Sequence, residues 1–234
     1  SQKKIGGNDM LGFTRVSRCA LRAVLAVSCC MIEQQALAQG APKMGGTLTV
    51  ASYSDTPIPD PIKTLALMTH TVLKHVCENL VTFDDDFNLI PQLADKWSVD
   101  DAGTSYTFTL RKGVKFHNGK ELQSEDVKYS LERAKQVAPN RGDFADITSV
   151  DATDPHTFVI RLSRPSPVFL TALAGPFIGY IVPKDLDKEQ GGEIAKPVCT
   201  GPYEWVEWQP DRLVRLRKYN AYAADQRFQK PTGL

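Results

Sequence analysis

The sequence lacks an apolar run long enough to cross a bilayer, which needs about 20 residues. Its longest such run, residues 23–32, falls well short of that length. It also lacks an excess of either charge: 28 lysines and arginines face 27 aspartates and glutamates, so the formal net charge is +1. The basic residues are scattered among carboxylates, which disfavours a nucleic-acid partner. We therefore expect neither a membrane-spanning helix nor nucleic-acid binding.

Enzyme signatures are also missing. The chain has no phosphate-binding glycine loop, no G-x-S-x-G and no H-E-x-x-H. The spacing of His70, His75 and Cys77 does not match a helical metal site, whose ligands stand three or four residues apart. His117 lies in an FHNG turn, where we expect it to hydrogen-bond locally, and His156 opens a strand. The sequence thus predicts no catalytic residue, no metal and no cofactor.

Cysteine is scarce, with five residues in 234. Three of them lie before residue 31, which leaves Cys77 and Cys199 in the rest of the chain. These two can pair in an oxidising compartment, but only if their Cα atoms approach within about 7 Å, which spacing does not reveal. The pairing stays open, and we favour two separate buried thiols.

The N-terminal segment has the pattern of a secretory signal peptide. Three arginines precede the apolar run of residues 23–32, and an A-x-A cleavage site follows it at residues 36–38. Residues 1–9 stand before Met10, which we take as the natural start. Cys29 follows a poor lipobox, Ala26-Val27-Ser28, so a lipid anchor is disfavoured. The pattern predicts export to the periplasm.

The middle of the chain predicts a β-β-α unit. Tyr106, Phe108 and Leu110 alternate with polar residues, as in a half-buried strand. An Asn-Gly turn follows a short second strand at residues 114–117. Ser124 then supplies a helix N-cap in front of two acidic residues, so we expect a helix over residues 125–136.

The remaining pattern predicts a mixed α/β chain. Trp205 and Trp208 stand three apart in a strand, so we expect them to face opposite sides. We expect further helices at residues 64–78 and 165–174, and further strands at residues 47–53, 80–83, 147–151, 156–162, 178–183, 203–208 and 212–219.

Four motifs carry a resemblance to a known family. They are PQLADKW, YTFTLRKGVKFHNG, SEDVKYSLER and TGPYEW, at residues 91–97, 106–119, 124–133 and 200–205. In wording, order and spacing they resemble the family 5 periplasmic solute-binding proteins of ABC importers. The resemblance runs from about Gly46 to the C-terminus. Cys77 and Asn79 depart from it, because the family more often has an aromatic residue and a glycine there.

The resemblance implies a fold and a domain layout. It implies an α/β (mixed α+β) fold, a periplasmic binding protein type II-like lobe I with its extra subdomain, and a missing second lobe. Residues 1–38 would be upstream residues and signal peptide, residues 39–75 and 177–234 the partial central lobe I, and residues 76–176 the extra subdomain. The chain resembles an N-terminal fragment; whether it is part of a longer gene product or a real truncation stays open.

The implied function is the solute-binding component of an ABC importer for peptides, a monomer that delivers solute to a membrane permease. The family holds the ligand main chain at the end of the first strand, here Tyr53, Ser54, Asp55 and Thr56, by β-strand addition. Asp55 can also attract a ligand amine, although an Asp before a proline-rich turn favours an Asx turn. A truncated, non-binding remnant and a nickel, opine or other small-solute binder remain as alternatives.

Overall fold

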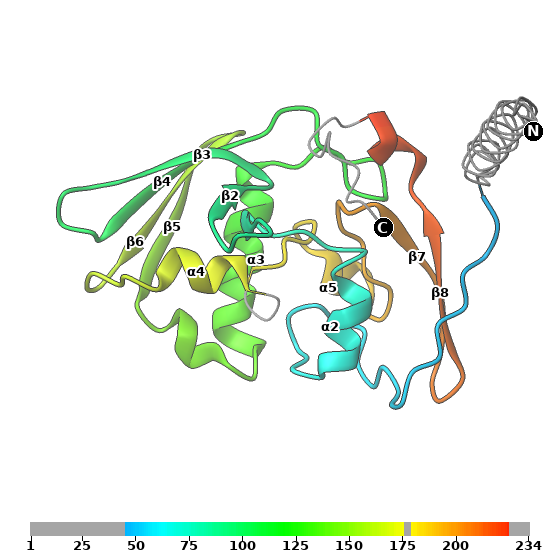
Figure 1. The fold of residues 1–234 in the computed structure, drawn as a ribbon. Coiled ribbons are helices and arrows are strands. Elements are labelled where there is room, and N and C mark those ends of the chain that lie inside the picture. Colours follow the sequence, from blue (N-terminus) through cyan, green and yellow to red (C-terminus); the bar gives the residue numbers. More distant parts are fainter. Residues whose placement is uncertain (1–44, 176–178, 225–234) are drawn as a thin grey trace, which may run out of the picture. The chain divides into compact units, whose positions relative to one another are not determined.

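The computed structural model describes residues 45–175 and 179–224 (Figure 1). The chain divides into two compact units, residues 1–51 and residues 52–234. The described part of the first unit, residues 45–51, contains neither helix nor strand. The predicted upstream residues and signal peptide, residues 1–38, lie outside the described residues. The predicted lobe boundaries near residues 76 and 176 stay a prediction.

A four-stranded antiparallel sheet forms the largest element of the second unit. Its strands are β3 (Ala94–Val99), β4 (Ser105–Leu110), β5 (Ile147–Asp154) and β6 (Thr157–Leu162), in the order β3-β4-β6-β5. The predicted alternation is confirmed, because Tyr106, Phe108 and Leu110 are buried while the residues between them are only half-buried. Phe108 stacks on Phe158 of the neighbouring strand, with ring centroids 5.1 Å apart.

Helix α3 (Ser124–Val137) confirms the predicted helix, and its buried face packs on β5. The predicted N-cap is wrong by one residue. Gln123 is the cap, because its backbone N–H donates to the carboxylate of Asp126 at 2.8 Å while its carbonyl accepts the backbone N–H of Asp126 at 3.0 Å. Ser124 is already helical, and its hydroxyl donates to the carbonyl of Asp154, the last residue of β5.

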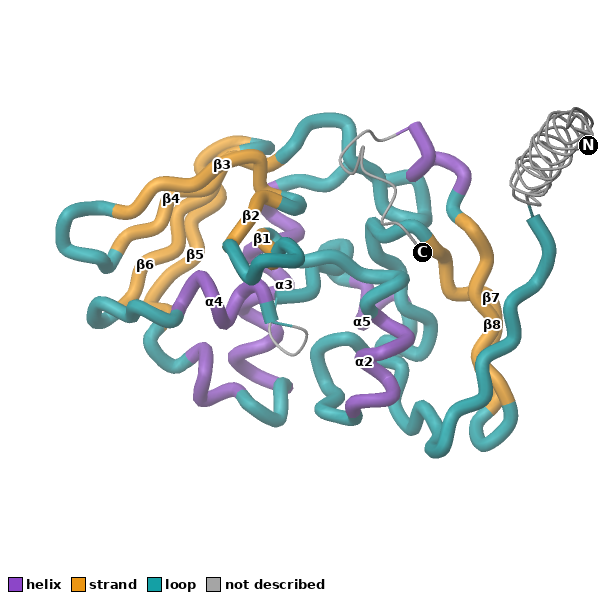
Figure 2. Tube along the Cα trace, in the orientation of Figure 1, coloured by secondary structure: helices purple, strands orange, loops and turns teal. Residues whose placement is uncertain are grey.

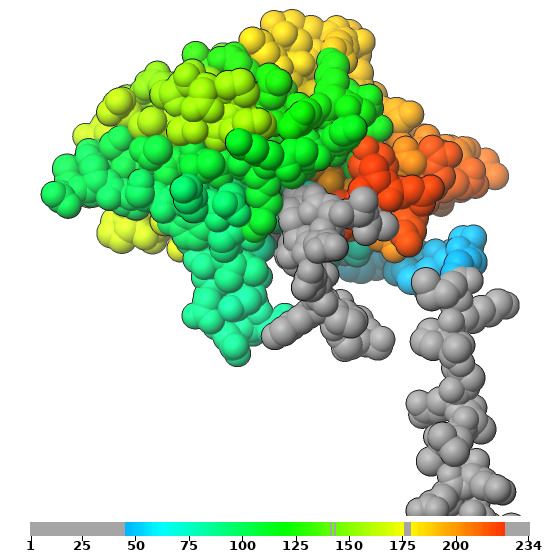
Figure 3. All heavy atoms as spheres, turned by 90° about the horizontal axis from the view of Figure 1, so that it is seen from above, coloured from blue at the N-terminus to red at the C-terminus, as the bar shows by residue number. Residues whose placement is uncertain are grey.

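The remaining elements lie outside the four-stranded sheet (Figure 2). The predicted turn at residues 84–88 and the predicted hairpin at residues 203–219 are both confirmed. The elements are α2 (Leu67–Leu73), β1 (Val81–Phe83), β2 (Leu89–Pro91), η1 (Arg141–Phe144), α4 (Phe169–Ala174), α5 (Leu186–Glu189), β7 (Tyr203–Gln209), β8 (Leu213–Lys218) and η2 (Asn220–Ala224). Within the second unit, the four-stranded sheet and the β7–β8 hairpin lie at opposite ends (Figures 1 and 3).

Three predicted strands are absent from the described residues. Residues 47–53 are not a strand, because no described segment pairs with them, and Leu48 is 88% exposed. Residues 114–117 make only one bridge, Lys115 to Glu121. Residues 179–183 are buried but not paired in a sheet; the backbone of Val182 instead bonds the hydroxyl of Ser130. Ile178, at the start of that prediction, lies outside the described residues.

The prediction for the two hairpin tryptophans is wrong. Trp205 lies opposite Leu216 and Trp208 opposite Val214, with a bulge between residues 205 and 207. Because Leu216 and Val214 stand two apart on β8, they share one face, and the tryptophans share it with them. The bulge supplies the extra residue that a strict alternation does not allow for.

A buried ion pair joins α3 to the loop that precedes α2. Arg133 donates to both carboxylate oxygens of Asp60, at 3.0 and 2.6 Å, and the two side chains are 5% and 1% exposed. Arg133 also donates to Asp187, at 3.2 Å, and Asp187 accepts the hydroxyl of Tyr129. The two parallel hydrogen bonds of such a bidentate pair fix the orientation of the guanidinium relative to the carboxylate and strengthen the ion pair.

We predict that Arg133→Met lowers the free energy of unfolding by about 3–5 kcal/mol, because Asp60 is then left buried without its cation. Urea unfolding measures this, and the double variant with Asp60→Asn should recover part of the loss. Arg164→Ala is the matched control: its ion pair with Asp146 is exposed, so it should cost at most about 1 kcal/mol. Equal losses in both single variants would contradict the prediction.

Candidate functional site

The predicted ligand-binding segment, Tyr53–Thr56, changes from exposed to buried along its length. Tyr53 is 84% exposed and Ser54 is exposed, Asp55 is half-buried, and Thr56 is 5% exposed. The hydroxyl of Ser52 donates to the carbonyl of Ser54 at 2.5 Å. The segment therefore presents exposed backbone at one end and is anchored at the other.

The anchor is the tip of the β7–β8 hairpin. The carboxylate of Asp55 accepts the backbone N–H of Asp211 at 2.9 Å, and the indole Nε1–H of Trp208 donates to the carbonyl of Thr56 at 3.0 Å. The bond to Asp211 takes the place of the Asx turn that the sequence favours at Asp55. Sequence reasoning does not reveal either partner, because both lie more than 150 residues away along the chain.

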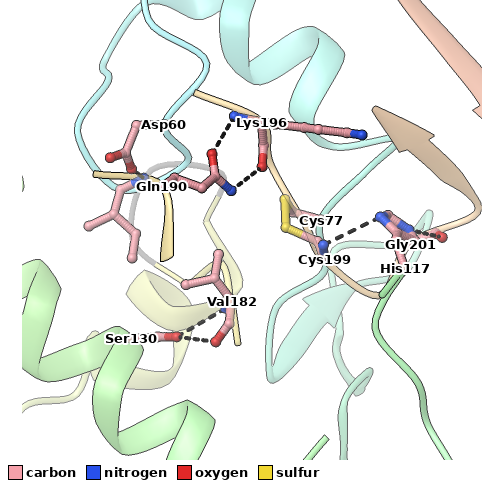
Figure 4. Close-up of a disulfide and its surroundings, with 10 residues drawn as sticks. Asp60, Cys77, His117, Ser130, Val182, Gln190, Lys196, Cys199 and Gly201 are labelled. Carbon is pink, nitrogen blue, oxygen red and sulfur yellow. Dashed lines mark hydrogen bonds between the residues drawn. A yellow bond between two sulfur atoms is a disulfide. The ribbon is translucent and has the colours of Figure 1, made fainter. Parts of the chain in front are cut away.

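The root of the same hairpin is cross-linked. Cys77 and Cys199 form a disulfide with a Cα–Cα distance of 4.8 Å, and the two residues are 2% and 0% exposed (Figure 4). The expectation of two separate thiols is therefore wrong. The fold brings together two residues that stand 122 positions apart. Backbone bonds flank the cross-link, from Gly201 N–H to Val76 at 2.9 Å and from Tyr203 N–H to His75 at 3.0 Å.

Gly201 occupies a position that admits no side chain. A Cβ atom there would lie 2.6 Å from the carbonyl oxygen of Val76, a contact that backbone cannot relieve cheaply. The glycine of the TGPYEW motif thus allows the chain to pass directly against the end of α2.

His117 joins the FHNG turn to this junction (Figure 4). Its Nε2–H donates to the carbonyl of Gly201 at 2.9 Å, and its Nδ1 accepts the backbone N–H of Cys199 at 3.3 Å. Its own backbone N–H donates to the carbonyl of Cys199 at 2.8 Å. The expectation of a purely local bond is wrong. Since Nδ1 accepts, the ring is neutral, and burial lowers its pKa from the ordinary value of 6.5.

The two histidines of the helix predicted over residues 64–78 also have structural roles. His70 is buried, its Nε2 bonds the carbonyl of Thr64 at 2.9 Å, and its ring stacks on Tyr180. His75 bonds the carbonyl of Thr71 through Nδ1, also at 2.9 Å. Among the described residues, no three His, Cys, Asp or Glu side chains gather as metal ligands. No helix within residues 45–175 or 179–224 has the length and apolar character that a bilayer crossing requires.

Solved structures define the class of this fold. The chain is similar to the Agrobacterium tumefaciens protein AgaA in complex with agropinic acid, at 30% identity and a TM-score of 0.66, over 71% of this chain and 34% of AgaA. It is similar to the Helicobacter pylori periplasmic binding protein DppA in complex with the peptide STSA, at 28% identity and a TM-score of 0.65, over 72% of this chain and 38% of DppA. The fold is that of part of a type II periplasmic binding protein.

Sequence comparisons narrow the class to a family. Residues 88–231 match the family model described as bacterial extracellular solute-binding proteins, family 5 middle. The chain is also 33% identical over 179 residues to the glutathione-binding protein GsiB of Escherichia coli K12, which covers 75% of this chain. The chain belongs to the family 5 bacterial extracellular solute-binding proteins. It spans 35% of the length of GsiB.

We predict that loss of the disulfide lowers the free energy of unfolding by about 2–5 kcal/mol, because the cross-link closes a loop of 122 residues in the unfolded chain. The double variant Cys77→Ala, Cys199→Ala tests this by urea unfolding with and without reductant. Reductant should destabilise the natural chain and leave the double variant unchanged. An effect of reductant on both chains would contradict the assignment to this pair.

We predict that His117 makes stability depend on pH below about 6.5. The unfolded chain binds a proton there that the folded ring excludes, so stability is fully present above 6.5 and falls with decreasing pH toward the lowered folded pKa. The slope is at most about 1.4 kcal/mol per pH unit. Urea unfolding of the natural chain and of His117→Gln, which retains the other histidines, should differ in slope over this range. Parallel curves would refute the role of His117.

Proposed function

We propose that this chain contributes the solute-contacting part of lobe I to the extracytoplasmic binding component of an ABC importer for peptides. One observation carries the proposal: the family match over residues 88–231 is accompanied by similarity to proteins whose names specify glutathione and peptide binding. The importer component would act in the periplasm as a monomer and would deliver its solute to a membrane permease. It would need neither a cofactor nor a covalent step.

The contact surface in this proposal is the segment Tyr53–Thr56. Tyr53 and Ser54 are exposed, and among the described residues the backbone groups of Ser54 bond only the nearby hydroxyl of Ser52, at 2.5 and 3.3 Å. An extended peptide that adds as a neighbouring strand would replace these local bonds. Main-chain bonds give affinity without selecting a peptide sequence. In the complete protein, a second lobe would close over the solute by hinge rotation.

An opine or other small-solute binder is the second candidate, and the similarity to AgaA with agropinic acid favours it. The two candidates differ in the role of the backbone. A peptide extends along the segment and bonds its main chain, whereas a compact solute with no peptide backbone relies on side chains. A non-binding remnant is the third reading, favoured by the exposure of Leu48, Val50 and Tyr53.

Calorimetry of the chain with the peptide STSA, glutathione and agropinic acid tests these candidates. We predict that Ser54→Pro weakens binding of STSA by about tenfold, because proline removes one backbone donor. Ser54→Ala retains that donor and is the matched control. Equal affinities of the two variants would contradict strand addition. Binding of agropinic acid without STSA would favour the second candidate, and failure of every solute to bind the natural chain would favour the remnant.

A further inference from the structure

The β7–β8 hairpin holds the candidate segment from a distant part of the chain. Its tip bonds the side chain of Asp55 through Asp211 and the carbonyl of Thr56 through Trp208. Both bonds fall on the anchored half of the segment, directly next to the exposed Tyr53 and Ser54. The exposed backbone ends at Ser54, one residue before the first fixed point, Asp55, and two before the second, Thr56.

Both bonding groups of the hairpin are themselves fixed. Trp208 lies on the same face of the hairpin as Trp205, which is buried in the core, so its indole has a defined position. Asp211 occupies the left-handed backbone region with φ 57° in the tight β7–β8 turn. Its role here depends on its backbone N–H and not on its carboxylate.

The hairpin is also fixed at its root. An isolated two-stranded hairpin is marginally stable in water, and β7 and β8 pair with no other described strand. The Cys77–Cys199 disulfide and the two backbone bonds to Val76 and His75 connect its first residues to the end of α2. With its root and its tip both attached, the hairpin forms a brace between α2 and the candidate segment.

A braced segment binds an extended peptide with a smaller loss of conformational entropy, because its backbone is ordered before the solute arrives. We propose that Trp208 and Asp55 are positioning residues for solute binding: they order the backbone of Tyr53 and Ser54, and the carboxylate of Asp55 holds the hairpin instead of a solute amine. This inference rests on the proposed function of the segment and adds the residues that hold it in place.

Amide hydrogen exchange tests the brace in the full oxidised chain. Trp208→Phe removes the indole donor and Asp55→Ala removes the acceptor, so each should speed exchange over residues 53–56 by roughly 2- to 10-fold. Asp55→Asn retains an acceptor oxygen and should restore most of the protection that Asp55→Ala loses. Trp97→Phe is the matched control: Trp97 packs on the core from β3, opposite Phe108, and this change should leave exchange at residues 53–56 as it was.

The positioning role is overturned if neither Trp208→Phe nor Asp55→Ala speeds exchange over residues 53–56, or if Trp97→Phe speeds it equally. Calorimetry with the peptide STSA distinguishes two roles of the Asp55 carboxylate: it holds the hairpin, or it contacts a solute amine. If Asp55→Asn exchanges more slowly than Asp55→Ala and also regains affinity for STSA, Asp55 is a positioning residue. If Asp55→Asn regains the protection but not the affinity, the charge of Asp55 contacts the solute and the proposal is overturned. If no chain binds STSA, the proposed function fails, while the exchange pattern still decides whether the brace exists.

Discussion

The contact between the end of α2 and residues 199–203 is the constraint on which the candidate site depends. The Cys77–Cys199 disulfide closes it covalently, and Gly201 lets two backbones meet where a Cβ would clash. His117 bonds both Cys199 and Gly201, so the FHNG turn is attached at the same point. The hairpin that holds Asp55 and Thr56 begins at this junction. Loss of the junction would release a two-stranded hairpin that has no sheet of its own.

The four-stranded sheet is stabilised differently. Its core consists of stacked and interlocking apolar side chains such as Phe108 and Phe158, and α3 covers it. The buried pair of Arg133 and Asp60 connects that helix to the loop before α2. Apolar burial is non-directional and tolerates substitution, whereas the junction and the ion pair depend on individual atoms in defined positions. We therefore expect the four-stranded sheet to tolerate apolar substitutions, whereas the junction at Cys199 to Tyr203 is sensitive to the loss of single bonds.

Cys77 and Asn79, the two residues that depart from the family resemblance, both make specific contacts in the structure. Cys77 stands where an aromatic residue is more common, and it pairs with Cys199. Asn79 stands where a glycine is more common, and its side-chain amide donates to the carbonyls of Ala174 and Gly175 at 3.0 and 3.1 Å, at the end of α4. Each of these two side chains joins segments 95 to 122 residues apart.

Sequence alone determined the elements whose signals are local. The alternation around Phe108 predicts β4, the helical spacing behind Ser124 predicts α3, and four motifs predict the family, because side-chain period and turn chemistry act over a few residues. Only the tertiary structure decided the cap at Gln123, the bulge that brings Trp205 and Trp208 to one face, the pairing of Cys77 with Cys199, and the bonds that hold Asp55 and Thr56. The disulfide and the bonds to Asp55 and Thr56 depend on distances between segments far apart in the chain, which no periodic pattern in a single sequence encodes. The cap and the bulge are local, but the hydroxyl of Ser124 bonds Asp154, 30 residues away, and a bulge interrupts the alternation from which strand faces are predicted.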